Sequence, residues 1–141
     1  DDVLDDYVLT GNINDLDELY LDSKGIQDLT GIENFTGLIY LNCTDNQLTS
    51  LDVSNNTALH ELWCGMNQIT SLDVSNNTAL TVLSCWNNQL TSLDVSNNTA
   101  LTYLSCNDNP NLTCIKVDDA TWSTSNWTNI DPQHYFSEAC P

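Results

Sequence analysis

Cysteine is the residue type with the most reactive side chain in this sequence, and four of the six cysteines are evenly spaced. These four recur at intervals of 21 residues: Cys43, Cys64, Cys85 and Cys106. A zinc site usually needs convergent thiolates at C-x-x-C spacing, and a buried thiol with no cation nearby stays protonated. A disulfide between neighbours would need a torsion of about 90°, which the side-by-side Cβ atoms of in-register parallel strands disfavour. We therefore predict free thiols that pack as small hydrophobic residues.

The other two cysteines, Cys114 and Cys140, lie outside this spacing and flank the C-terminal tail. We predict a disulfide between them. Because structural disulfides form and persist in oxidising environments, this bond would place the protein in an oxidising compartment.

Three aspartates repeat at the same interval and are weak candidates for a calcium site: Asp52, Asp73 and Asp94. Calcium prefers carboxylate oxygens, but the glycine-turned D-x-D-x-D loop that usually supplies them is missing. Like charges at strand spacing repel by roughly several tenths of a kcal/mol or more. We expect serine and asparagine donors to offset this repulsion, with bound calcium as the alternative. The N-terminal group Asp1, Asp2, Asp5 and Asp6 is similarly weak, and we predict no cofactor.

The sequence contains no pattern that predicts an enzyme. The two histidines, His60 and His134, lie far apart in the order of the repeats. No G-x-S-x-G, H-E-x-x-H or phosphate-binding glycine loop is present. Acid/base chemistry by paired carboxylates needs a cleft that raises one pKa, and an open face made of repeats offers none.

The segment SLDVSNNTALTVLSCWNNQLT, residues 71–91, shows what positions these side chains. Its phrase LDVSNNTAL occurs at 51–59, 72–80 and 93–101, and a period of 21 residues is typical of a stacked solenoid. Each unit contains L-x-x-L-x-C-x-x-N-x-L, the leucine-rich repeat pattern with cysteine at one inward position. Alternation predicts one short parallel strand per turn, with its second leucine and its cysteine inward. We expect the repeated asparagine to bond loop backbone groups that lack partners.

These repeats predict a leucine-rich repeat solenoid with a short parallel β-sheet on one face and extended or turn segments on the other. We expect little helix, because S-N-N-T turns interrupt the repeats, and capped ends, because a solenoid's outer coils are otherwise exposed. The predicted organisation is an N-terminal cap over 1–15, five repeats of 21–22 residues over 16–113, and a C-terminal cap over 114–141.

Positions shared by the repeats must serve the scaffold, whereas outward positions that differ between repeats are not required by it. These differing positions are therefore candidates for ligand contact. The predicted binding residues are Tyr20, Tyr40, Glu61, Trp63, Met66, Val82, Trp86 and Tyr103. Exposed aromatic clusters usually mark a contact site, and Trp and Tyr suit both protein hot spots and sugar rings. The alternative is that these rings pack laterally across the sheet without any ligand and differ through drift after duplication.

The formal charge of −18 restricts the partners. Such a surface repels nucleic acid phosphates and anionic lipid headgroups, and no apolar run of 18 residues predicts a membrane span. Glycans, basic proteins and divalent cations remain. The chain begins at Asp1 with neither an initiator Met nor a signal peptide, and we interpret it as a processed or trimmed fragment.

The chain resembles secreted leucine-rich repeat proteins of the Bacteroidetes, particularly of marine flavobacteria. The matching phrases are DDVLDDYVLT, GIQDLTGIENFTGL, LNCTDNQLTSLDVSNNTAL and LTCIKVDDATWSTSNWTNIDPQHYFSEAC. The resemblance implies an exported, often surface-displayed adhesion or recognition module, typically released by type IX secretion. The short helical opening and the C-terminal sorting domain usual in that family have no counterpart in residues 1–141, so we expect the N-terminal cap over 1–15 to be incomplete.

We expect a secreted or cell-surface recognition module that binds a protein or peptide through the aromatic outward face of its strands. The first alternative is a carbohydrate-binding module that stacks sugar rings on Trp and Tyr. The second is a structural spacer within a larger surface protein.

Overall fold

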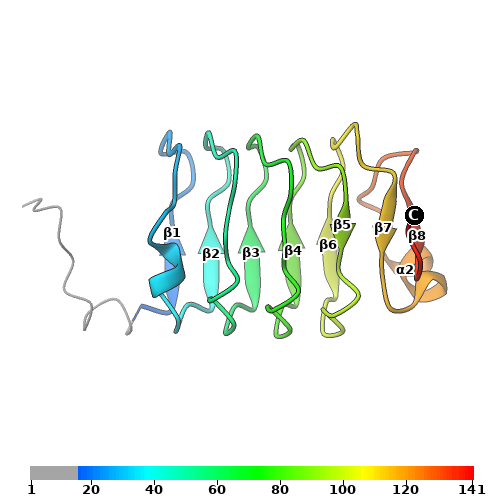
Figure 1. Ribbon diagram of the computed structural model, residues 1–141, viewed down its shortest axis with the longest axis horizontal. Coiled ribbons are helices and arrows are strands. Elements are labelled where there is room, and N and C mark those ends of the chain that lie inside the picture. Colours follow the sequence, from blue (N-terminus) through cyan, green and yellow to red (C-terminus); the bar gives the residue numbers. More distant parts are fainter. Residues whose placement is uncertain (1–15) are drawn as a thin grey trace, which may run out of the picture.

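Each repeat of the sequence forms one coil of a parallel β-solenoid in the computed structural model, which describes residues 16–141 (Figure 1). The coils stack along one axis and number about six, which confirms the predicted leucine-rich repeat solenoid. The predicted N-terminal cap over residues 1–15 lies outside the described residues.

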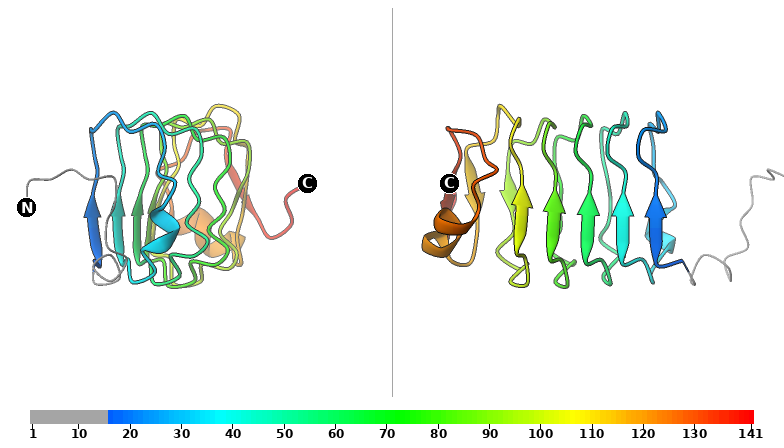
Figure 2. Two further views of the ribbon diagram at one scale, coloured as in Figure 1. Left: turned by 60° about the vertical axis from the view of Figure 1, so that its left-hand side comes forward. Right: turned by 180° about the vertical axis from the view of Figure 1, so that it is seen from behind.

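A five-stranded parallel sheet follows one side of the stack, in the order β1-β2-β3-β4-β6 (Figure 2). Its strands are β1 (Glu18–Tyr20), β2 (Tyr40–Asn42), β3 (Glu61–Trp63), β4 (Val82–Ser84) and β6 (Tyr103–Ser105). Each strand comes from one predicted repeat, and the middle residue of each strand is a leucine that points into the coil. The predicted alternation is confirmed: the leucines of β2, β3, β4 and β6 are at most 1% exposed.

A second parallel sheet contains β5 (Leu93–Asp94), β7 (Cys114–Lys116) and β8 (Tyr135–Ser137), in that order. β5 comes from the second half of a repeat, where the sequence predicted an extended segment. The C-terminal residues also bridge the first sheet, because Ser105 pairs with Asn129 in parallel. The predicted C-terminal cap is thus itself wound as a further coil, although the leucine pattern has ended.

Within residues 16–141, helix is limited to two short elements, as expected. The seven-residue α2 (Ala120–Asn126) lies in the C-terminal coil, where Asp119 accepts a hydrogen bond from the Trp122 N–H at 2.8 Å as the N-cap. A 3-10 turn, η1 (Ile32–Asn34), interrupts the first repeat. This repeat reads GIENFTGL in place of the S-N-N-T turn, and Gly31 provides the positive φ of 107° at its start.

The four periodic cysteines are free and fully buried in the core of leucine, isoleucine and valine. Burial raises the pKa of Cys43 and of Cys85 to about 12, and it raises the pKa of Cys64 and of Cys106 as well. These thiols therefore stay protonated and pack as hydrophobic side chains, which confirms the prediction.

A ladder of asparagines (Asn46, Asn67, Asn88 and Asn109) holds the loops that follow the strands. Asn67 is typical: its Nδ2 donates to the Cys43 and Cys64 carbonyls at 3.0 and 3.2 Å, and its Oδ1 accepts the Leu48 N–H at 3.0 Å. The amide thus satisfies buried backbone groups of its own coil and of the preceding one. The sequence predicted this role.

A second ladder in the S-N-N-T turns (Asn56, Asn77 and Asn98) was not predicted. Asn77 Nδ2 donates to the carbonyls of Val53 and Asn56 in the preceding coil, both at 2.9 Å. The signal was present in the sequence, since this asparagine is identical in three copies. The repeated S-N-N-T phrase predicts a turn, but it does not predict that its second asparagine is buried and bonds the preceding coil.

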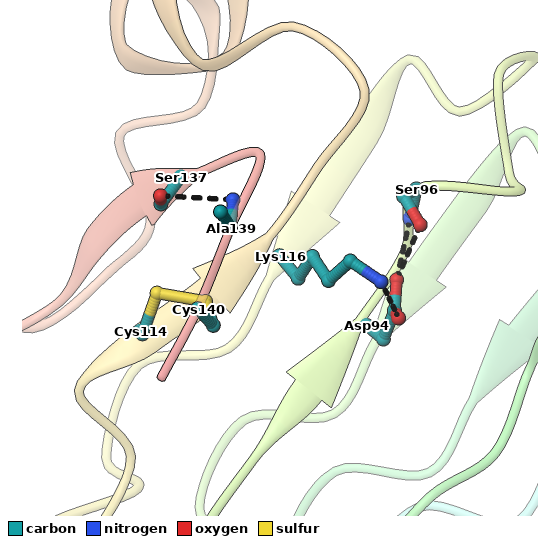
Figure 3. Close-up of a disulfide and its surroundings, with 7 residues drawn as sticks. All are labelled: Asp94, Ser96, Cys114, Lys116, Ser137, Ala139 and Cys140. Carbon is teal, nitrogen blue, oxygen red and sulfur yellow. Dashed lines mark hydrogen bonds and ion pairs between the residues drawn. A yellow bond between two sulfur atoms is a disulfide. The ribbon is translucent and has the colours of Figure 1, made fainter.

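The predicted disulfide joins Cys114 in β7 to Cys140, with their Cα atoms 5.7 Å apart (Figure 3). It closes the C-terminal end of the solenoid. Trp127 and Phe136 fill the core there, with ring centroids 5.7 Å apart. Trp122 and Tyr135, two further aromatic residues of the predicted C-terminal cap, stay exposed.

Candidate ligand-binding face

The outward side chains of the five-stranded sheet form two rows fixed by strand register. One row runs Glu18, Tyr40, Glu61, Val82, Tyr103, and the other runs Tyr20, Asn42, Trp63, Ser84, Ser105. We call these two rows, together with Trp86 from the loop after β4, the aromatic face. Strand register therefore brings six of the eight predicted binding residues together on one surface, and a seventh, Trp86, lies in a loop beside it, against Gly65. The eighth, Met66, is 38% exposed in the loop after β3.

Two aromatic pairs organise this surface. Tyr20 and Tyr40 lie on adjacent strands, with ring centroids 4.9 Å apart. Trp63 and Tyr103 lie two strands apart, on β3 and β6, and still come within 6.0 Å. Two strand spacings amount to about 9.6 Å, so these two side chains must lean toward each other over β4.

This leaning explains the small residues between the two rings. The outward residues of β4 are Val82 and Ser84, and Ser84 is only 2% exposed although it points away from the core. A larger side chain at Ser84 would occupy the space that Trp63 and Tyr103 need. The lateral-packing alternative is therefore correct in its geometry, and the rings still keep exposed surface: Tyr20 is 59% and Tyr103 38% exposed.

Trp86 is seated differently, on the backbone of the preceding coil. A Cβ atom on Gly65 would come within 2.7 Å of Trp86 Cδ1, so the indole occupies the space where any other residue would place its side chain. The φ of Gly65 is not positive, and glycine is needed there for space alone. Comparison of the repeats identifies Trp86 as variable, but it does not reveal that this residue pairs with Gly65.

Two glutamates orient the aromatic side chains. Glu18 accepts a hydrogen bond from the Tyr20 hydroxyl at 2.8 Å, and Glu61 accepts one from Trp63 Nε1 at 3.0 Å. The hydrogen bond that Tyr20 donates to Glu18 raises the pKa of Tyr20, while burial and then the charge of Glu61 raise the pKa of Tyr40. The half of the face over β1–β3 is thus acidic, and the half over β4 and β6 is neutral.

The aspartate ladder (Asp52, Asp73 and Asp94) lies outside the aromatic face, and its charges are balanced as expected by serines. Each Oδ1 accepts the N–H of the serine two residues later, at 2.9, 2.9 and 3.0 Å. Hydrogen bonding by these serines lowers the pKa of Asp52 and Asp73. Asp94 also pairs with Lys116 Nζ at 2.9 Å (Figure 3). Between residues 16 and 141, no three side chains are grouped to hold a metal ion, and calcium binding stays a weak prediction.

The histidines lie on different coils. His60 is exposed just before β3, with Nδ1 3.0 Å from the Ala58 carbonyl oxygen. His134 is buried in the C-terminal coil, where its Nδ1 accepts the Asp131 N–H at 3.1 Å. The structure does not bring the two imidazoles together.

The sequence matches the family model of leucine-rich repeats (two copies) over residues 36–77 and 78–119. The chain belongs to the leucine-rich repeat family. Folds of this family are typical of protein–protein interaction modules without enzymatic activity. Along the part of the leucine-rich repeat chain that the structure describes, no helix has the length and apolar character of a membrane span.

Among solved structures, this leucine-rich repeat protein is similar to the functional domain of InlJ from Listeria monocytogenes, with a TM-score of 0.70 and 38% identity. The match covers 89% of this chain and 30% of that one. The InlJ domain is described as including a cysteine ladder, and the chain studied here has one too: Cys43, Cys64, Cys85 and Cys106.

An internalin, inlF, from Listeria monocytogenes 4b F2365 is similar in fold, with a TM-score of 0.62 and 23% identity over 92% of this chain and 49% of that one. The leucine-rich repeat chain therefore spans half or less of the length of these two relatives. A comparison with curated proteins found no match.

Proposed function

We propose that this leucine-rich repeat protein is an extracellular recognition module that binds a protein or peptide partner through its aromatic face. The observation that carries the proposal is the arrangement of two ring pairs on one five-stranded surface, each with one exposed ring (Tyr20, Tyr103) and one half-buried ring (Tyr40, Trp63). Rigid strands hold these rings in place, so a partner would lose little conformational entropy of the protein on binding. Aromatic residues of this kind are enriched among protein hot spots.

The acidic half of the face indicates the chemistry of the partner. Glu61 accepts a single hydrogen bond, from Trp63, and retains lone pairs for a further donor beside the ring. A partner with arginine or lysine next to an apolar side chain would match this half, and an uncharged apolar segment would match the half over β4.

Carbohydrate binding is the second candidate. Exposed Tyr20 and half-buried Trp63 each have a glutamate hydrogen-bonded to the ring's polar atom. An aromatic platform beside a carboxylate can stack a sugar ring and accept hydrogen bonds from its hydroxyls.

The disulfide supports a secreted or cell-surface location, because such bonds form in oxidising compartments. Release by a bacterium of the Bacteroidetes type rests on the resemblance of the sequence phrases. It is part of the proposal.

Two parallel screens test the function. One captures proteins from extracts of host or neighbouring cell surfaces on immobilised protein, and the other applies labelled protein to a glycan array. Each is repeated with Trp63→Ala and, as a matched control away from the face, Thr70→Ala, which is exposed on the side opposite the strands. Protein capture that Trp63→Ala removes and Thr70→Ala retains supports the proposal. Glycan binding with the same dependence favours the second candidate, and silence in both screens favours a spacer.

A further inference from the structure

A cavity of about 250 Å³ lies between the last S-N-N-T turn and helix α2. Its lining includes Thr99, Thr102, Asp118, Asp119, Trp122 and Trp127, none of which belongs to the aromatic face. Register places α2 where another S-N-N-T turn would stack, because β5 pairs with β7 so that Asp94 lies opposite Lys116. The cavity therefore exists because this last coil is not a copy of the others.

An exposed indole forms one wall of this cavity. Trp122 is 43% exposed and stands perpendicular to Trp127, with ring centroids 5.3 Å apart. In an edge-to-face pair at most one face of either ring is covered, so at least one face of Trp122 is free of Trp127. The base of the pair is rigid, since Trp127 is 5% exposed and its Nε1 donates to the Thr102 carbonyl at 3.3 Å.

Two carboxylates stand next to this indole. Asp119 uses Oδ1 to cap α2 and leaves Oδ2 free, while Asp118 makes no hydrogen bond or ion pair with any residue of the described chain. The chain itself supplies little balancing charge, because it has two basic residues against 20 acidic ones. Of these two, Lys116 is paired with Asp94 and Lys24 lies in the first coil.

We propose that Trp122, Asp118 and Asp119 form a second binding site, which takes a lysine or arginine side chain of a basic protein partner. A cation over the face of Trp is attracted by the ring's quadrupole, and two carboxylates on the rim strengthen that attraction. The charge of −18 draws a basic segment toward the whole molecule, and the indole selects where one of its cations is held. This site does not depend on the aromatic face.

The test is an NMR titration of ¹⁵N-labelled protein with Nα-acetyl-arginine methylamide. The control ligand is Nα-acetyl-citrulline methylamide, which has nearly the same shape but carries a neutral urea group. We expect saturable shifts of the Trp122 indole and of the amides of residues 118–120 in the millimolar range, with at least a tenfold weaker response to citrulline. Raised salt should weaken the binding, because the carboxylates are exposed.

Two variants separate the site from general attraction to an acidic surface. Trp122→Ala and Asp118→Asn should each weaken arginine binding by about two- to fivefold, while Asp45→Asn, an exposed aspartate of another coil, leaves it unchanged. Asp118→Asn removes charge alone, so it keeps the test valid if Trp122→Ala perturbs folding. The proposal is overturned if the protein responds equally to the arginine and citrulline ligands, or if all three variants have equal effects. A third titration uses methyl glucoside as a neutral sugar ligand. Binding of this sugar without any response to arginine would also overturn the proposal. Trp63→Ala should not alter this titration, because Trp63 lies on the aromatic face. If the titration shows no site at Trp122, the proposed function of the aromatic face is therefore unaffected.

Discussion

The indole of Trp86 rests on the backbone of Gly65, where a Cβ atom would come within 2.7 Å of Trp86 Cδ1. The other coils have Thr44 and Asn107 at positions equivalent to Gly65, so the glycine is specific to the coil that Trp86 covers. Trp86 is half-buried, and it can leave this seat by rotating its side chain into solvent. A residue with no side chain thereby positions part of the aromatic face.

Gly65→Ala should therefore displace Trp86 while the fold stays intact. We expect the unfolding free energy to fall by less than about 1 kcal/mol, since a partly exposed ring can move away. Affinity for a partner captured by the wild-type protein should fall by about 1–2 kcal/mol, which is typical of an interface aromatic. Near-ultraviolet circular dichroism and calorimetric titration measure the two effects.

Thr44→Ala is the control, because it trims a side chain at the equivalent position of the preceding coil. If Gly65→Ala changes the dichroism of the tryptophans and leaves the affinity unchanged, Trp86 is not part of the binding surface.

The turns between strands depend on single asparagines. Asn67 is buried, and four hydrogen bonds hold its amide: Oδ1 accepts from Leu48, and Nδ2 donates to Cys43, Cys64 and Gly65. Its removal leaves the N–H of fully buried Leu48 without this acceptor. An unsatisfied buried backbone group costs about 1–3 kcal/mol.

Asn67→Ala should accordingly lower the unfolding free energy by about 2–4 kcal/mol, measured by urea denaturation. Its neighbour Gln68 is exposed, and Gln68→Ala should change stability by no more than about 0.5 kcal/mol. Similar costs for both variants would show that the ladder does not hold the loops.

The buried thiols should make the stack of coils less stable at alkaline pH. Burial raises the pKa of Cys43 and Cys85 from 9.0 to about 12, and it also raises the pKa of Cys64 and Cys106. The folded state thus binds protons that the unfolded chain has already released. Stability from this source is fully present below about pH 9 and is lost as the pH rises toward 12.

Each thiol contributes a slope of about 1.4 kcal/mol per pH unit in that interval. The raised pKa values of Tyr20 and Tyr40 act in the same direction at somewhat higher pH. Denaturation at a series of pH values should show a fall that begins near pH 9 and that becomes shallower in Cys85→Ala. A stability that does not change between pH 9 and pH 12 would contradict the protonated, buried ladder.

The repeat pattern explains why the strands and the core were predictable. Each copy fixes one strand, and alternation fixes Leu83 and Cys85 as inward residues in every register that buries leucine. The repeat pattern could not predict the structure beyond the last repeat. Residues 114–141 wind another coil with Phe136 and Trp127 in place of leucines, and no periodicity marks them. Side-chain rotamers could not be predicted from the sequence either. Period and register place Trp63 on a face, but they do not determine that its side chain leans over β4.

At the scale of the whole molecule, the stack has one surface built from rings and several built from polar side chains. The aspartates, threonines and serines opposite the strands repeat almost unchanged from coil to coil, whereas the aromatic face changes with each strand. A scaffold that is constant on one side and varied on the other is expected of a recognition module.

The central claim is that the rings on this face bind a partner and do more than pack against one another. Its most direct test compares two quantities for Trp63→Ala: affinity for the captured partner, and unfolding free energy. Loss of the ring pair with Tyr103 should cost about 0.5–1.5 kcal/mol of stability, which leaves the solenoid folded, and binding should become undetectable at concentrations that saturate the wild type. Unchanged affinity in a folded Trp63→Ala protein would contradict the account.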